Sequence, residues 1–131
     1  MTHLENQLIT IDEEISFKNG VYKNFLEILQ ISFPKVYNYL SWKDEENMYM
    51  SDFDLSYVLI ADITYYITIL HKKWDFDTIK GLLNLFDDIM TSTQVWKNHI
   101  FSSFRDIIIS YPEVLSDILP FMPEWLRSMF K

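Results

Sequence analysis

The scarcity of glycine constrains the fold of this 131-residue chain most, because the sequence holds only two glycines and four prolines. Tight hairpin turns depend on such residues, so a fold of many short strands is disfavoured. Long helices joined by short connections need far fewer of them. Hydrophobic residues make up 49% of the chain, which is ample for a buried core. The sequence therefore predicts an all-α protein that forms a single domain over residues 1–131.

Apolar residues recur at helical spacing through most of the chain. They predict a first helix from Val21 to about Ile31, and Pro34 opens a short second helix with Ser32 as a candidate cap. Residues 1–18 show little periodicity and are expected to form a loosely ordered lead-in. The expected fold is a compact bundle of about five to seven helices, with stacked antiparallel pairs of the HEAT kind as one arrangement. Further helices are expected at about residues 52–72, 76–90, 95–108 and 112–118, with a helical turn over 120–130.

Two of these segments are distinctive. The segment ending at Lys72 is apolar almost all round, and its β-branched residues would also suit a strand, but its length favours a helix. The next segment has the clearest amphipathic pattern, and Asp75 or Asp77 is a candidate for its N-terminal cap. Its apolar stripe consists of Phe76, Ile79, Leu82, Leu83, Phe86, Ile89 and Met90.

The charge balance limits the classes of partner. Nineteen acidic side chains against 11 basic ones give a net charge of −8. Nonspecific binding to nucleic acid or to an anionic membrane relies on lysine and arginine, so neither partner is expected. The sequence also has no signal-peptide pattern and no apolar stretch of about 20 residues. We therefore expect a cytoplasmic protein.

The residue types that usually carry catalysis do not form motifs here. The chain has no cysteine, and His3, His71 and His99 are far apart in the sequence. Gly20 and Gly81 are isolated, so no glycine-rich phosphate loop can form, and no Gly-x-Ser-x-Gly sequence occurs. The sequence predicts a protein that is not an enzyme and that uses no cofactor or metal. His71, near a predicted helix C-terminus, is favoured there by the helix dipole.

Asp62 is the ionisable residue with the most ambiguous position. On a helical wheel it lies among apolar residues and the two tyrosines Tyr65 and Tyr66. A buried carboxylate has a raised pKa and can form part of a functional pocket. The structural alternative is that Asp62 accepts a hydrogen bond from a tyrosine hydroxyl or lies at a gap between helices.

Acidic residues are interleaved with aromatic residues and methionines between Trp42 and Asp54, which is a composition suited to docking a basic protein. Aromatic residues dominate interface hot spots, and clustered negative charge speeds encounter with a cationic partner. The adjacent Asp87 and Asp88 are interpreted as a solvated acidic face, because neighbouring helical residues diverge by about 100°. The candidate partner-binding residues are Trp42, Asp44, Glu45, Glu46, Tyr49, Asp52, Asp54, Asp87 and Asp88.

One combination of spacing and helix order runs through residues 21–131: Phe25-Leu26-x-x-Leu29, Phe33-Pro34, Phe86-Asp87-Asp88-Ile89, then Val95, Asn98 and Phe104, and a short closing helix. In this combination the chain resembles the small, acidic, all-helical immunity-type proteins of bacterial toxin–immunity systems. The resemblance implies a non-enzymatic protein that neutralises a toxin, expected to be a basic domain, by occluding it. The alternative is a helical scaffold or adaptor that binds a peptide or a partner helix.

Overall fold

The computed structural model describes residues 21–40, 52–90, 97 and 100–130, and every regular element in these ranges is helical. The predicted all-α class is confirmed, and the seven α-helices in the described ranges agree with the expected five to seven. The predicted lead-in at residues 1–18 lies outside the described residues. No helix in the described part of the chain is both long and apolar enough to span a membrane.

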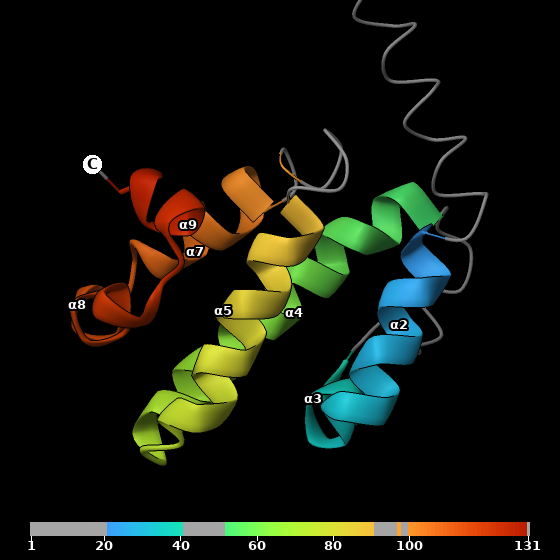
Figure 1. Ribbon diagram of the computed structural model, residues 1–131, viewed down its shortest axis with the longest axis horizontal. Helices are drawn as coiled ribbons and strands as arrows, with labels where there is room; N and C mark the ends of the chain where they lie inside the picture. The colour runs from blue at the N-terminus through green and yellow to red at the C-terminus, as the bar shows by residue number, and fades with distance from the viewer. Residues whose placement is uncertain (1–20, 41–51, 91–96, 98–99, 131) are drawn as a thin grey trace, which may run out of the picture.

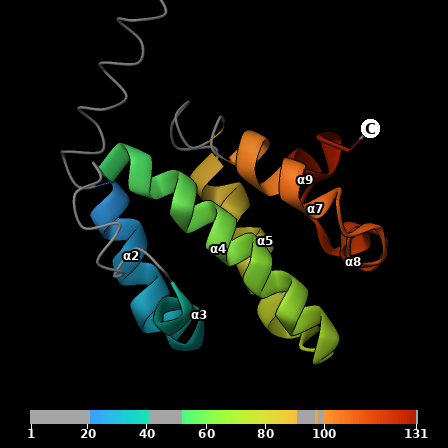
Figure 2. The ribbon, with the colours of Figure 1, turned by 180° about the vertical axis from the view of Figure 1, so that it is seen from behind.

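An antiparallel pair, α4 (Asp52–Lys72) and α5 (Phe76–Met90), occupies the middle of the molecule (Figure 1). The helices α2 (Val21–Ser32) and α3 (Pro34–Tyr39) lie on one side of this pair. The C-terminal helices lie on the other side, as the reverse view also shows (Figure 2). They are α7 (Asp106–Ile108), α8 (Pro112–Ile118) and α9 (Glu124–Ser128). A HEAT-like stacking of several such pairs stays a prediction.

The central position of α4 explains its composition. Ile60 and Ile63 are fully buried, and so is Thr64. The Thr64 hydroxyl donates to the carbonyl of Ile60 at 2.8 Å, and the Thr68 hydroxyl donates to the carbonyl of Tyr65 at 2.6 Å. Buried polar groups are thus satisfied within the helix itself. The helix predicted for this segment is confirmed and the strand alternative is wrong, because a helix covered on most sides needs apolar residues in nearly every direction.

The turn between α4 and α5 ends in a side-chain cap. One carboxylate oxygen of Asp75 accepts from the backbone N–H of Thr78 at 3.2 Å, and the other accepts from the Thr78 hydroxyl at 2.8 Å. These bonds satisfy a backbone donor that the first turn of a helix leaves free. Asp75 is therefore the cap among the two predicted candidates, and Asp77 lies in the first turn of α5.

The cap predicted between α2 and α3 is wrong. Phe33, not Ser32, holds the N-cap position of α3, and its side chain makes no capping hydrogen bond. Pro34 decides this, because a residue that precedes proline is pushed out of the helical conformation. The Phe33 ring then lies against Gly81 of α5, where an added Cβ would be only 3.0 Å from the ring. Gly81 therefore allows α5 to approach the α2–α3 corner closely.

The regular helix predicted over 95–108 is wrong in part. Residues Ile100–Arg105 form the π-helical turn η3, and only Asp106–Ile108 continue as the α-helix α7. Residues 91–96, 98 and 99 lie outside the described residues. Apolar spacing does not distinguish i→i+5 from i→i+4 hydrogen bonding over one or two turns. The predicted starts at Pro112 and the helical turns after Pro120 are confirmed by α8, by the 3-10 turn η4 (Leu119–Phe121) and by α9.

Candidate functional site

Tyr39 lies within electrostatic range of Asp62 and of three further tyrosines from two other parts of the chain. Tyr39 lies at the end of α3, Tyr65 and Tyr66 lie on α4, and Tyr111 lies directly before α8. Asp62 precedes Tyr65 and Tyr66 by three and four residues, which places all three on one side of α4. The rings of Tyr39 and Tyr66 are 5.0 Å apart and tilted by 55°. We name these five residues the tyrosine cluster.

The tyrosine cluster is open to solvent. Tyr39 and Tyr65 are each 42% exposed and Tyr111 is 38% exposed, while Tyr66 and Asp62 are half-buried. Tyr66 packs against the hydrophobic core, and the ring of Tyr39 packs on Tyr66, so Tyr39 contacts α4. A phenol ring suits such a position, because its carbon face packs on apolar neighbours while its hydroxyl reaches water. The cluster thus presents aromatic surface that the fold itself does not cover.

Burial and neighbouring ionisable groups both raise the pKa of Tyr39. Partial burial is the largest cause that raises the Tyr39 pKa above 10.0, and the negative charge of Asp62 is the second. Smaller contributions to this pKa come from Tyr111, Tyr65 and Tyr66. At neutral pH the Tyr39 phenol therefore keeps its proton and can donate a hydrogen bond.

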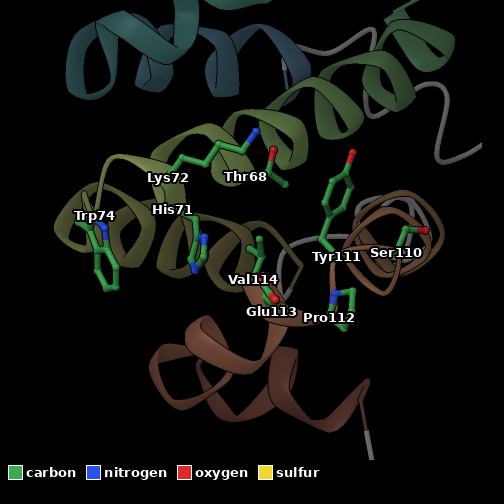
Figure 3. A pocket seen from close by; sticks show the side chains of 9 residues that line it. All are labelled: Thr68, His71, Lys72, Trp74, Ser110, Tyr111, Pro112, Glu113 and Val114. Carbon is green, nitrogen blue, oxygen red and sulfur yellow. The ribbon is translucent and has the colours of Figure 1, made fainter.

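A groove of about 590 Å³ adjoins the tyrosine cluster and shares Tyr111 with it (Figure 3). It lies between the C-terminal end of α4 and the segment that enters α8. A volume of this size is typical of sites that hold a small molecule or a short peptide segment. We name it the α4–α8 groove, and it is lined by Thr68, His71, Lys72, Trp74, Ser110, Tyr111, Pro112, Glu113 and Val114.

An imidazole–carboxylate pair holds one end of the α4–α8 groove together. His71 Nε2 lies 2.7 Å from Asp117 Oδ2, which joins the last turn of α4 to α8. The His71 side chain is 16% exposed and that of Asp117 is 50% exposed. His71 does lie at the helix C-terminus, as predicted, but no local pattern indicates its partner Asp117, which is 46 residues away. A carboxylate can orient a catalytic histidine in this way. The Thr68 hydroxyl also lines the groove, but it donates its hydrogen bond to the backbone carbonyl of Tyr65 and not to His71.

Trp74 lies beside this pair in an unusual conformation. Its φ is 58°, in the left-handed region that L-residues other than glycine, asparagine and aspartate seldom adopt. Trp74 is 76% exposed, and its ring lies 6.4 Å from the ring of His71 and 5.7 Å from the ring of Phe76, which are themselves 6.0 Å apart. A left-handed residue commonly ends a helix, yet that role alone would favour glycine. An exposed indole is therefore held at the rim of the groove against a backbone preference.

Most of the predicted partner-binding residues cannot be placed. Trp42, Asp44, Glu45, Glu46 and Tyr49 lie outside the described residues. Asp52 and Asp54 belong to the first turn of α4, and their side chains also lie outside what the structure describes. Their role in binding a partner stays a prediction.

Asp87 and Asp88, the predicted acidic pair, differ in solvent exposure. Asp88 is exposed, as expected of a solvated face, whereas Asp87 is half-buried. The Asp87 Oδ1 atom is buried and has no hydrogen-bond partner among the described residues. Burial is the larger cause that raises the Asp87 pKa above 3.8, and the charge of Asp88 is the smaller. Asp87 therefore does not belong to a fully solvated face, and the prediction that both bind a partner stays untested.

Sequence reasoning found part of the tyrosine cluster and missed the rest. Helical spacing placed Asp62 beside Tyr65 and Tyr66, and the structure keeps these three together on a half-buried flank of α4. Tyr39 and Tyr111 come from elements far away in the sequence, so no periodicity could connect them. The described residues contain no group of three histidine, cysteine, aspartate or glutamate side chains that could hold a metal ion. In comparisons with known proteins, no family model, curated protein or solved structure matches the chain.

Proposed function

We propose that this protein is a non-enzymatic binding protein that covers a basic protein domain with the tyrosine cluster, in an immunity-type role that blocks a toxin by occlusion. The single observation that carries this proposal is the exposed aromatic surface where Tyr39 packs on Tyr66, next to the exposed Tyr65 of α4. Tyrosine is enriched in binding surfaces, because its ring supplies a large contact area and loses little conformational entropy when it is fixed. The excess of negative charge favours a basic partner.

Occlusion requires a larger surface than these five residues. A stable interface buries about 800 Å² on each partner. The α4–α8 groove extends the tyrosine cluster on one side, through the shared Tyr111. In the sequence, the predicted docking interval of residues 42–54 follows the end of α3 at Tyr39 and runs into the first turn of α4. The proposed interface consists of the tyrosine cluster and the α4–α8 groove, and a contribution from residues 42–54 stays a prediction.

Site-specific photo-cross-linking in cells tests this proposal. A photoreactive phenylalanine analogue replaces Tyr65 in the full chain, which is co-expressed with the product of the neighbouring reading frame. The matched control carries the analogue at Trp125, which is 56% exposed on α9. We expect cross-linking at position 65 but not at 125, together with rescue from growth arrest that Tyr65→Ala weakens. No complex and no rescue would overturn the proposal.

The α4–α8 groove favours a second candidate function, that of a peptide-binding adaptor. Its volume of about 590 Å³ and the exposed Trp74 at its rim suit a short peptide segment. Salt distinguishes the two functions. Association with a basic domain through carboxylates is expected to slow as ionic strength rises, whereas insertion of an apolar peptide into the groove is expected to be nearly indifferent to salt.

A further inference from the structure

We infer that the α4–α8 groove binds a peptide segment of a partner in which one apolar residue lies between an acidic residue and a basic residue. This inference rests on the second candidate function, because it names the kind of peptide that the groove accepts. It begins from the lining of the groove, which separates into a floor and a rim. The floor consists of Thr68, His71 and Val114, and the six other lining residues are exposed and form the rim.

The floor of the groove offers mainly apolar contacts to a ligand. Val114 is 7% exposed. The Thr68 hydroxyl already donates to the carbonyl of Tyr65 at 2.6 Å, and His71 Nε2 lies 2.7 Å from Asp117 Oδ2. A ligand group that covers this floor therefore gains free energy by leaving water and not by making new hydrogen bonds with these atoms. An aliphatic side chain such as leucine suits the floor.

The rim of the groove carries two opposite charges. Lys72, the last residue of α4, and Glu113, the second residue of α8, are both exposed. Within the described part of the chain neither residue makes an ion pair, with the other or with any third group. The two residues lie on opposite sides of the groove (Figure 3). A ligand with both charges can complete one pair at each side, whereas a ligand with one charge is attracted by one side and repelled by the other.

A peptide segment fits this arrangement better than a single amino acid does. The groove, at about 590 Å³, has room for a side chain together with its flanking backbone. Because Lys72 and Glu113 are not in contact, the two complementary charges belong on different residues of the ligand. Trp74, at 76% exposed, and Tyr111, at 38%, add aromatic surface at the rim. Such a segment has no net charge, so its association stays nearly indifferent to salt.

Titration of the full ¹⁵N-labelled chain with five blocked pentapeptides tests the inference. Four peptides have the sequence Gly-X-Leu-Z-Gly, in which X is glutamate or glutamine and Z is arginine or glutamine. The fifth has glutamate, glycine and arginine at the three central positions. NMR of the indole N–H groups locates the binding. We expect the Trp74 signal to shift and the signal of Trp125, which is exposed on α9, to stay in place.

The affinities of the peptides for the wild-type protein are expected to rank by charge and by the central residue. Replacing glutamate at X, or arginine at Z, by glutamine is expected to weaken binding about threefold, the usual size of an exposed ion pair. The glycine peptide is expected to bind at least tenfold more weakly than its leucine counterpart, because its central residue buries almost no apolar surface on the floor.

Four variants connect each charge to its side of the groove. In Lys72→Gln the two residues at X are expected to give equal binding, and in Glu113→Gln the two residues at Z are expected to do so. The matched controls are Lys73→Gln and Glu124→Gln, which remove the same charges from residues that do not line the groove. Both controls are expected to keep the threefold differences. All four side chains are exposed, so the variants are expected to fold.

Three results would overturn the inference. They are equal binding of the four leucine peptides to the wild-type protein, a threefold difference at X that survives in Lys72→Gln or one at Z that survives in Glu113→Gln, and a glycine peptide that binds as tightly as its leucine counterpart. If the leucine peptides shift the Trp74 signal but bind equally, charge recognition is refuted and the peptide-binding adaptor stands. If no peptide shifts this signal, the inference is refuted, and cross-linking at position 65 decides the immunity-type role independently.

Discussion

Tertiary packing builds two aromatic clusters in this protein, and the two differ in solvent exposure. In the first, Phe104 is fully buried, and its ring lies 5.4 Å from that of Phe86 and 6.0 Å from that of Phe130. In the second, the tyrosine cluster, Tyr39 and Tyr65 are each 42% exposed. We name the first the phenylalanine cluster. The hydroxyl makes the difference, because a phenol can remain at a wet surface at little cost whereas a phenyl ring gains from complete burial.

The two clusters also differ in which elements they join and in how much ring surface they leave uncovered. The phenylalanine cluster joins α5, η3 and the C-terminal residues, so it holds distant parts of the chain together. The tyrosine cluster joins α3, α4 and Tyr111 yet leaves much of its ring surface uncovered. One cluster is therefore part of the buried core, and the other leaves aromatic surface exposed to solvent.

Truncation of the two clusters should give the largest difference. Phe104→Ala is expected to lower the free energy of unfolding by about 3–5 kcal/mol, the usual cost of removing a buried phenyl ring. Tyr65→Ala is expected to lower it by less than about 1 kcal/mol, because that ring is already partly in water. Urea denaturation followed by circular dichroism measures both values, and similar losses in the two variants would contradict this difference between the clusters.

Trp74 extends the comparison to an aromatic residue that is exposed and conformationally strained. Trp74→Gly is expected to be more stable than Trp74→Ala by about 1 kcal/mol, because only glycine adopts a φ of 58° without penalty. Both variants lose the contacts with His71 and Phe76. The difference between their stabilities therefore measures the cost of the left-handed backbone conformation at position 74. Thermal unfolding of the two proteins measures it, and equal stability would show that the backbone at position 74 relaxes freely.

Asp87 follows Phe86 of the phenylalanine cluster in α5 and is half-buried, and its titration is expected to affect stability. Its pKa in the folded protein is raised above 3.8, so the native state holds more protons than the unfolded state in the range just above that pH. Stability is therefore lost as pH rises through this range. Asp87→Asn is expected to remove that loss and to raise the free energy of unfolding at pH 7 by roughly 1 kcal/mol at most.

The matched control for Asp87 is Asp88→Asn. Burial outweighs the Asp88 charge as a cause of the raised Asp87 pKa, so the control is expected to give the smaller gain in stability. The denaturation midpoints of both variants are measured between pH 3.5 and pH 7. A gain that persists unchanged below pH 3.8 would refute the electrostatic explanation.

The smallest expected effect is a change in the titration of Tyr39 in the tyrosine cluster. Its pKa lies above 10.0, and Asp62→Asn is expected to lower this pKa without returning it to 10.0, because burial is the larger cause. Since the folded state retains this proton longer than the unfolded state, stability is expected to fall as pH rises above 10. NMR titration of ¹³C-labelled tyrosine rings measures the pKa, and an unchanged value in Asp62→Asn would separate the carboxylate from Tyr39.

The helices were predictable to within a few residues where their signals are local. The stripe from Phe76 to Ile89 and the prolines at the start of α3 and α8 involve neighbours within about four positions, which is the range of helical hydrogen bonds. The Ser32 cap and the regular helix over 95–108 were wrong because side-chain capping and π-helical turns depend on details that apolar spacing does not contain.

The candidate site was predictable only within one helix. The amino-acid sequence by itself determined the all-α class and the juxtaposition of Asp62 with Tyr65 and Tyr66, and it narrowed the α5 cap to Asp75 or Asp77, because each depends on short-range periodicity. Tertiary structure alone decided that Tyr39 and Tyr111 join them and that His71 meets Asp117. These contacts join residues that are tens of positions apart, and their formation depends on how the helices bury their apolar faces against α4.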